Sequence, residues 1–121
     1  MAAIAVPLIA DKVASWKAWV AECTGPRRKE FNEFNRRMEI TEHRVWLTEG
    51  PSGPLAIVVL EGPGGETMIQ KLASSDHPFD TWFRERISEF HGRDFSAPME
   101  GSLPESLMNW RSGESTLAAE S

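Results

Sequence analysis

The stretch "LAIVVLEG", residues 55–62, decides the fold, because its first six residues are all apolar. A strand with one buried face alternates apolar and polar side chains, whereas an unbroken apolar run predicts a strand that is covered on both faces. The preceding stretch "ITEHRVWLTEG", residues 40–50, shows the alternating pattern. Because the Gly- and Pro-rich "EGPSGP" separates them, the two strands are expected to pair as an antiparallel hairpin.

The chain before this hairpin predicts an edge strand followed by helical structure. Residues 3–9, "AIAVPLI", are apolar, and Pro7 confines such a strand to an edge because proline cannot donate to a sheet ladder. Asp11 is the expected N-cap of a helix with apolar residues at spacings of 3 and 4. Gly25-Pro26 interrupts this stripe and a similar one resumes after it, so one kinked helix and two separate helices fit equally well. The apolar positions are Val13, Trp16, Val20 and Cys23, then Phe31, Phe34 and Met38.

The chain after the hairpin predicts two more helices. Residues 66–73 carry a helical stripe, and the next helix is expected to begin near Pro78, whose missing N–H costs nothing there, and to stop at Gly92. The remainder is rich in loops, with one short helix or strand expected around Glu105–Trp110. Residues 1–112 are expected to form a single α+β domain, and residues 113–121 a disordered tail.

The order of these elements predicts most of a ferredoxin-like βαββαβ unit, an antiparallel sheet with helices on one face. The fourth strand is uncertain, because no regular strand pattern follows Gly92. Such a sheet leaves its other face bare, yet residues 55–60 are apolar on both faces. The economical cover is the same face of a second copy, which predicts a two-fold homodimer.

Composition makes several functions unlikely. The net charge of −5 over 121 residues argues against a nucleic-acid partner, and no apolar run approaches the roughly 20 residues that span a bilayer. No basic amphipathic helix suggests a membrane surface. The lone Cys23 excludes an intrachain disulfide and favours a reducing compartment, so a cytoplasmic location is expected.

The polar side chains of the alternating strand form the first candidate site. Glu42, Arg44 and Trp46 share one strand face and could line a ligand pocket between two sheets, with Glu42 as a base and Arg44 as an anion clamp. The alternative is an ion pair at the strand end, with Trp46 packing an interface. His43 points to the other face, where a satisfied core or rim histidine is the simpler interpretation.

Two further histidines lie in the last helix. His77 and His91 are 14 residues apart, about 20 Å along a helix, so they cannot share a metal ion, and no metal site is predicted. At the helix start, the neighbouring Asp76 can cap exposed N–H groups. At its end, an imidazolium interacts favourably with the helix dipole. The alternative is that Asp94 orients His91 as a general base.

Three segments carry a resemblance to a known group of proteins: "RRKEFNEFNRRMEITEHRVWL", "PLAIVVLEG" and "SSDHPFDTWFRERISEFHG". Over about residues 5–92 the chain resembles the dimeric α+β barrel superfamily, which includes cofactor-free monooxygenases, EthD-like proteins and stress-responsive barrel proteins. It looks most like a bacterial family of uncharacterised single-domain proteins within that group.

The resemblance implies a homodimer without a cofactor, and three functions stay open. The barrel could bind a small, partly apolar ligand in its cavity. It could be a cofactor-free oxygenase or isomerase that acts on an activated, acidic substrate, with Glu42 or His91 as the base and Trp46 shaping the pocket. It could also be a non-catalytic structural or interaction module with a close-packed interface.

Overall fold

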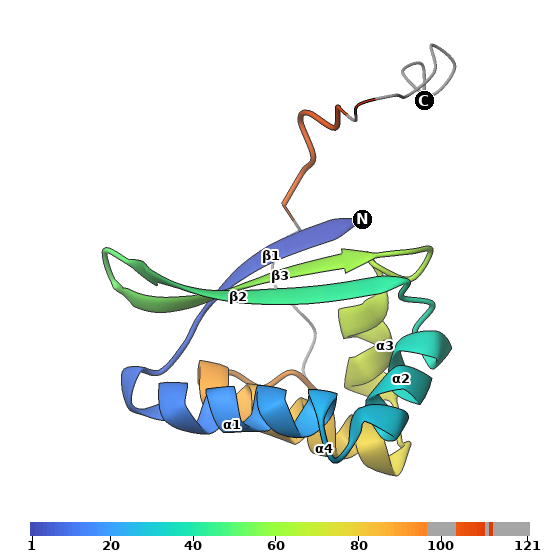
Figure 1. The fold of residues 1–121 in the computed structure, drawn as a ribbon, viewed down its shortest axis with the longest axis horizontal. Coiled ribbons are helices and arrows are strands. Elements are labelled where there is room, and N and C mark those ends of the chain that lie inside the picture. The colour runs from blue at the N-terminus through green and yellow to red at the C-terminus, as the bar shows by residue number, and fades with distance from the viewer. Residues whose placement is uncertain (97–103, 111, 113–121) are drawn as a thin grey trace.

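The computed structural model describes residues 1–96, 104–110 and 112, which form a three-stranded antiparallel sheet with helices on one of its faces (Figure 1). No helix in this part of the chain is long and apolar enough to cross a bilayer. The strands are β1 (Ala2–Pro7), β2 (Glu42–Gly50) and β3 (Gly53–Glu61), and the helices are α1 (Val13–Thr24), α2 (Arg28–Arg37), α3 (Met68–Ser74) and α4 (Pro78–His91), with a 3-10 turn at Ala10–Lys12 before α1.

The strand order is β1-β3-β2, so the apolar strand β3 lies in the middle of the described sheet. The predicted hairpin is confirmed, with Trp46 opposite Ile57, and β1 pairs on the other side of β3, with Ala5 opposite Ile57. β1 is an edge strand that ends at Pro7, as the proline predicts. Among the described residues, the helices cover only one face of the sheet and leave the opposite face bare (Figure 1).

The interruption at Gly25-Pro26 separates two helices, so the kinked-helix alternative is wrong. α1 ends at Thr24, and the Arg27 N–H then donates to the Glu22 carbonyl at 2.9 Å, which closes the turn before α2 begins at Arg28. The expected cap at Asp11 is also wrong. The chain makes a 3-10 turn there, and no side-chain oxygen caps α1. Its start is set instead by the Ile9 N–H, which donates to the Phe90 carbonyl of α4 at 2.9 Å.

The core between helices and sheet is largely aromatic. Phe83 of α4 stands at its centre, with ring centroids 4.7 Å from Phe34 and 4.9 Å from Trp19. Phe34, Phe79 and Phe90 are almost completely buried. Aromatic side chains each bury a large area and gain further energy from tilted or offset contacts. This cluster therefore fixes α1, α2 and α4 relative to one another.

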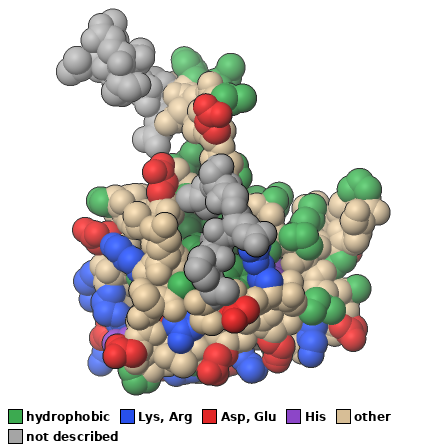
Figure 2. All heavy atoms as spheres, turned by 180° about the vertical axis from the view of Figure 1, so that it is seen from behind, with side chains coloured by type: hydrophobic (Ala, Val, Ile, Leu, Met, Phe, Trp, Pro, Cys, Tyr) green, Lys and Arg blue, Asp and Glu red, His purple; other side chains and the backbone are tan. Residues whose placement is uncertain are grey.

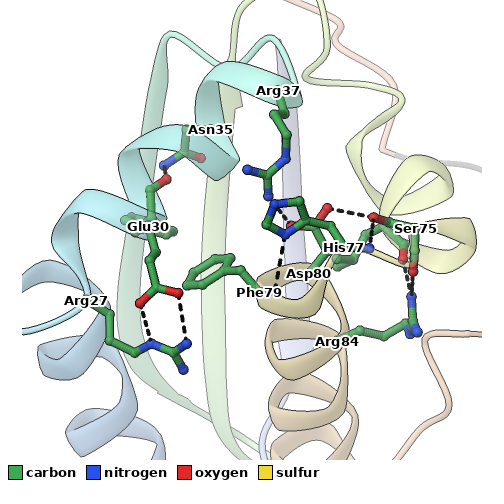
Figure 3. Close-up of polar contacts among 11 residues, drawn as sticks. Arg27, Glu30, Asn35, Arg37, Ser75, His77, Phe79, Asp80 and Arg84 are labelled. Atoms are coloured by element: carbon green, nitrogen blue, oxygen red, sulfur yellow. Dashed lines mark hydrogen bonds and ion pairs between the residues drawn. The ribbon is translucent and has the colours of Figure 1, made fainter.

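A buried carboxylate joins the corner between α3 and α4 to α2 (Figure 3). Asp80 is 1% exposed; it accepts a hydrogen bond from the Arg37 guanidinium at 2.5 Å and one from the Ser75 hydroxyl at 2.7 Å. Arg84 donates to the Leu72 and Ser75 carbonyls at 2.6 and 2.9 Å, which satisfies the end of α3. Each of these charged groups has a hydrogen-bond partner within the corner, so the corner stabilises the packing of α2, α3 and α4.

The start of α4 differs from what the sequence predicts, whereas its end agrees with it. His77 itself is the N-cap, because its Nδ1 accepts from the Phe79 N–H at 3.2 Å, so the cap expected from Asp76 is wrong. Gly92 ends the helix in the left-handed conformation, as predicted.

Residues 104–110 contain no helix or strand, so the short element expected around Glu105–Trp110 is wrong. The tail predicted over residues 113–121 lies outside the described residues.

Candidate functional site

Glu42, Arg44 and Trp46 lie together on the bare face of the sheet, as their alternation along β2 predicts. The Arg44 Nη2 is 3.2 Å from a carboxylate oxygen of Glu42 and 3.1 Å from one of Glu61, its diagonal neighbour on β3. The guanidinium also lies 5.9 Å from the centre of the Trp46 ring. Arg44 thus has its charge compensated by two carboxylates, which weakens the case for an anion clamp. A ligand role for these three residues stays a prediction.

His43 points from β2 to the other face, into the layer between sheet and helices. The Asn35 Nδ2 donates to the Phe31 carbonyl at 3.1 Å, which orients the Asn35 amide so that its Oδ1 accepts from the His43 Nδ1 at 2.9 Å. Burial lowers the pKa of His43 to about 4. The ring is therefore neutral near pH 7 with its proton on Nδ1, and its Nε2 is left as a hydrogen-bond acceptor.

His91 lies on the same side of the sheet as His43, at the end of α4. Its Nδ1 is 2.8 Å from the Pro7 carbonyl, and since a carbonyl only accepts, Nδ1 carries the proton. Burial lowers the pKa of His91, although the bond to Pro7 opposes this shift. This direction disfavours the imidazolium that is predicted at the helix end. Asp94 does not orient this ring, because its carboxylate accepts from the Ser96 N–H at 2.9 Å.

The two bases suggested by the sequence cannot serve one site in a single chain. Glu42 stands on the bare face of the sheet with 56% of its side chain exposed, whereas His91 lies under β1 on the helix-covered side. The structure therefore separates the Glu42 site from the His91 site.

A partly open cavity of about 130 Å³ lies on the helix-covered side, between the sheet and helices α1, α3 and α4. Its walls are almost entirely apolar, and His43 and His91 are among the few polar side chains that line it. Pro7 and Arg93 are lining residues that are also exposed, so the cavity reaches the surface beside the outer edge of β1. The apolar walls include Trp16, Trp19, Val45, Ala56, Phe83 and Ile87.

Trp19, one of the lining residues of the cavity, has a hydrogen-bond donor that is not used. The side chain lies in the core, with 9% of the residue exposed, and its Nε1–H has no hydrogen-bond partner among the described residues. A buried donor without a partner costs about 1–3 kcal/mol. From the sequence alone the burial of Trp19 is less obvious than that of Trp16, although its position three residues after Trp16 and four before Cys23 places it on the buried face of α1.

The remaining reactive groups are occupied or inaccessible. The Nδ1 of His77 is used as the N-cap of α4. Cys23 is buried, and desolvation raises the pKa of its thiol to about 12, so it is a poor nucleophile. Across the described part of the chain, no group of three or more His, Cys, Asp or Glu side chains could hold a metal ion.

Comparison of the chain with protein-family models, with curated proteins and with solved structures gave no match, and its function is therefore inferred from its own geometry.

Proposed function

We propose that the protein binds a compact, largely apolar molecule with one hydroxyl or carbonyl oxygen in the cavity between the sheet and the helices. The observation that carries this proposal is that Trp19, a residue of the cavity lining, has a buried Nε1–H without a hydrogen-bond partner among the described residues. A ligand oxygen that accepts this N–H would remove the cost of the unpaired donor.

The size of the cavity limits the ligand to about one ring. An apolar cavity of roughly 150 Å³ takes up a benzene molecule in a well-studied engineered protein. The present cavity, at about 130 Å³, suits a small aromatic or alicyclic ring with few substituents. A larger ligand would need side chains at the mouth to move.

The polar groups of the cavity favour a neutral ligand. His43 and His91 are both uncharged near pH 7, because burial lowers the pKa of each imidazole. Each has its proton on Nδ1 and so keeps an acceptor at Nε2, while Trp19 offers a donor. Arg93 at the mouth is the cationic side chain of the lining. A buried carboxylate would lose its hydration inside these apolar walls, so a phenol or a cyclic ketone fits better.

The cavity is preferred to the space between two sheets that the sequence suggests. The latter site, around Glu42, Arg44 and Trp46, requires a second copy, and Arg44 is already neutralised by two carboxylates. The cavity on the helix-covered side is formed by one chain and needs no partner. This choice moves the proposed ligand to the opposite side of the sheet.

The proposal is tested by comparing pairs of ligands of similar size in which a methyl group replaces the oxygen. Ligand-observed NMR would compare phenol with toluene, and cyclohexanone with methylcyclohexane. The oxygenated member of each pair should bind roughly tenfold more tightly, the value of about one good hydrogen bond. Trp19→Phe keeps a ring but removes the donor, so it should abolish this preference.

A second variant tests the place of binding. Ala56 is buried and lines the cavity, so Ala56→Ile fills the space and should abolish binding while the protein stays folded by circular dichroism. Thr48→Ile is the matched control, because it adds a similar side chain to an exposed position of the same hairpin. Binding that survives Ala56→Ile, or no binding of any of the four compounds, contradicts the proposal.

A second candidate function is base catalysis on such a ligand. The observation in its favour is the neutral His91 in the cavity wall, whose Nδ1 is held by the Pro7 carbonyl and whose Nε2 keeps its lone pair. Such a base could remove a proton from the carbon next to a ketone, the first step of a cofactor-free isomerisation.

This second candidate predicts exchange of those protons with solvent. In D₂O, the protein should accelerate deuterium incorporation into cyclohexanone, as followed by NMR. His91→Asn keeps a donor for Pro7 but has no basic nitrogen, so the acceleration should disappear while ketone binding persists. Equal exchange rates for the variant and the wild type would exclude His91 as the base.

A further inference from the structure

A polar groove of about 310 Å³ lies between α2 and the outer edge of β2. Because α2 lies below the start of β2, the helix and the strand form its two walls (Figure 1). The groove is distinct from the apolar cavity, whose mouth is beside β1 at the opposite edge of the sheet, although His43 lines both. The polar lining residues are Asn32, Asn35, Arg36, Thr41, Glu42 and His43.

One wall of this groove is the edge of a strand with main-chain groups that point outward. Across the described ranges, β2 pairs with β3 only. Main-chain groups alternate in direction along β3. Because the Pro54 carbonyl accepts from the Leu8 N–H on the β1 side at 3.0 Å, Leu55 and every second residue after it bond to β2. The β2 residues between these bonded pairs direct their N–H and C=O groups outward. They are His43, Val45, Leu47 and Glu49.

The edge of β2 lacks features that commonly prevent the addition of a strand. Natural edge strands are protected by short length, by proline or lysine, or by a covering segment. β2 has nine residues without proline or lysine, whereas β1 has six and ends at Pro7. The segment 104–110 does not cover this edge either, because its apolar side chains stand clear of the body of the molecule and Leu107 is 87% exposed (Figure 2). The edge of β2 is therefore open to a further strand.

The charges of the groove favour an acidic partner. Glu42 is compensated by Arg44, whose Nη2 lies 3.2 Å from its carboxylate. Three other lining side chains make no hydrogen bond or ion pair within the described part of the chain, and each of them can donate a hydrogen bond. They are Asn32, Arg36 and Thr41. Since Arg36 is cationic, the group that fits these donors best is a carboxylate.

From the open edge, the groove beside it and the charge of Arg36, we infer that this protein binds an extended peptide with an acidic side chain as an additional strand on β2. The main chain of the peptide pairs with the outward groups of His43, Val45 and Leu47, which supplies affinity for many sequences. Alternate side chains of the peptide face the groove, where the acidic one pairs with Arg36 and supplies selectivity. This site is independent of the ligand cavity, because the two open at opposite edges of the sheet.

The first test measures the binding of capped, fluorescently labelled hexapeptides to the full-length protein by fluorescence anisotropy. The probe alternates threonine and valine and carries one central glutamate. Replacing this glutamate by glutamine should weaken binding about threefold, as the loss of an exposed ion pair does. Methylation of the alternate amide nitrogens that face β2 should weaken binding at least about tenfold, because several main-chain hydrogen bonds are lost. Methylation of the other alternate set is the control and should have little effect.

Two variants of α2 test the role of Arg36. Arg36→Gln should remove the preference for the glutamate peptide and leave the affinity for the glutamine peptide unchanged. Arg28→Gln is the matched control, because it removes the same charge from the other end of α2, outside the groove, and should retain the preference. Equal losses in the two variants would show attraction by the overall charge of α2, which would overturn the pairing with Arg36.

A change in the main chain tests the role of the strand edge. Val45→Pro removes one outward N–H from the middle of β2 without removing a bond to β3, which an edge strand tolerates. It should weaken peptide binding about fivefold relative to Val45→Ala, which loses the same packing but keeps the N–H. Circular dichroism checks that both variants are folded. The methylated peptides test the same hydrogen bonds with the wild type if Val45→Pro does not fold.

Hydrogen exchange followed by NMR identifies the strand that binds the peptide. The amides of His43, Val45 and Leu47 should exchange quickly in the protein alone and become protected when the glutamate peptide is added. Protection without peptide would show that the chain itself or a second copy already covers this edge, which would overturn the inference. Three further results would overturn it: binding that is insensitive to methylation, competition by N-acetylglutamate as strong as that of the peptide, or no binding of either peptide.

Discussion

The pKa of His43 is about 4 in the folded protein, while an unperturbed imidazole titrates near 6.5. Between these values the unfolded chain binds a proton that the folded protein does not, so stability falls as the pH falls through this window and is fully present above pH 6.5. His43 is responsible for this pH dependence, because burial desolvates its imidazole and lowers its pKa.

Replacement of His43 should remove this part of the pH dependence. Both proteins should lose unfolding free energy between pH 7 and pH 4.5. The loss should be about 2 kcal/mol larger for the wild type than for His43→Gln, because Gln does not titrate. Carboxylates contribute equally to both proteins and cancel in the difference. Urea unfolding at the two pH values provides the measurement, and parallel losses in the two proteins would show that His43 is not the titrating group.

At the residue scale, the sequence predicted which side chains share a face of β2, but it did not predict which side chains line the cavity. The period of β2 was enough to bring Glu42, Arg44 and Trp46 together, because side chains alternate strictly along a strand. Trp19 could have been assigned to the buried face of α1 from its spacing to Trp16. That its N–H lacks a partner could not be predicted, because this depends on every side chain that packs around the indole.

At the scale of elements, the corner between α3 and α4 is held to α2 by the buried Asp80. Asp80 is buried, whereas 33% of the Arg37 side chain is exposed, so water can solvate the Arg37 charge when Asp80 is removed. A hydrogen bond to a charged group contributes about 1.5–3 kcal/mol. Asp80→Ala should therefore lower the unfolding free energy by about that amount in urea titrations, because it removes the hydrogen bonds from Arg37 and the Ser75 hydroxyl.

An exposed ion pair on α2 provides the control for this prediction. Glu30 pairs with Arg27 at 3.0 Å on the surface, where water and salt screen the interaction. Glu30→Ala should leave the urea midpoint nearly unchanged. If Asp80→Ala also left the urea midpoint nearly unchanged, the hydrogen bonds of Asp80 would not stabilise the corner between α3 and α4.

The elements themselves were largely predictable because each has a strong internal pattern. The hairpin, the edge strand ending at Pro7 and the stop of α4 at Gly92 depend on local chemistry, and all three are confirmed. The cap expected at Asp11 failed because the bond from Ile9 to Phe90 of α4 sets the path of the chain there. Such a contact joins residues far apart in the sequence, and no local pattern reveals it.

At the scale of the whole molecule, one sheet separates two surfaces with different chemistry. The helix-covered side has an apolar cavity whose lining includes His43, His91 and Trp19. The bare side presents an apolar face with a paired charge cluster at its end. Because the two lie on opposite sides of β3, changes at Trp46 should leave ligand binding in the cavity intact.

The central claim is that a ligand oxygen accepts the N–H of Trp19, and its most direct test is the indole proton resonance of Trp19 in ¹H–¹⁵N NMR spectra, assigned with Trp19→Phe. On addition of phenol this proton should move downfield, as a new hydrogen bond requires, while toluene should leave it near its starting position. A resonance that responds equally to both compounds, or to neither, would contradict the claim.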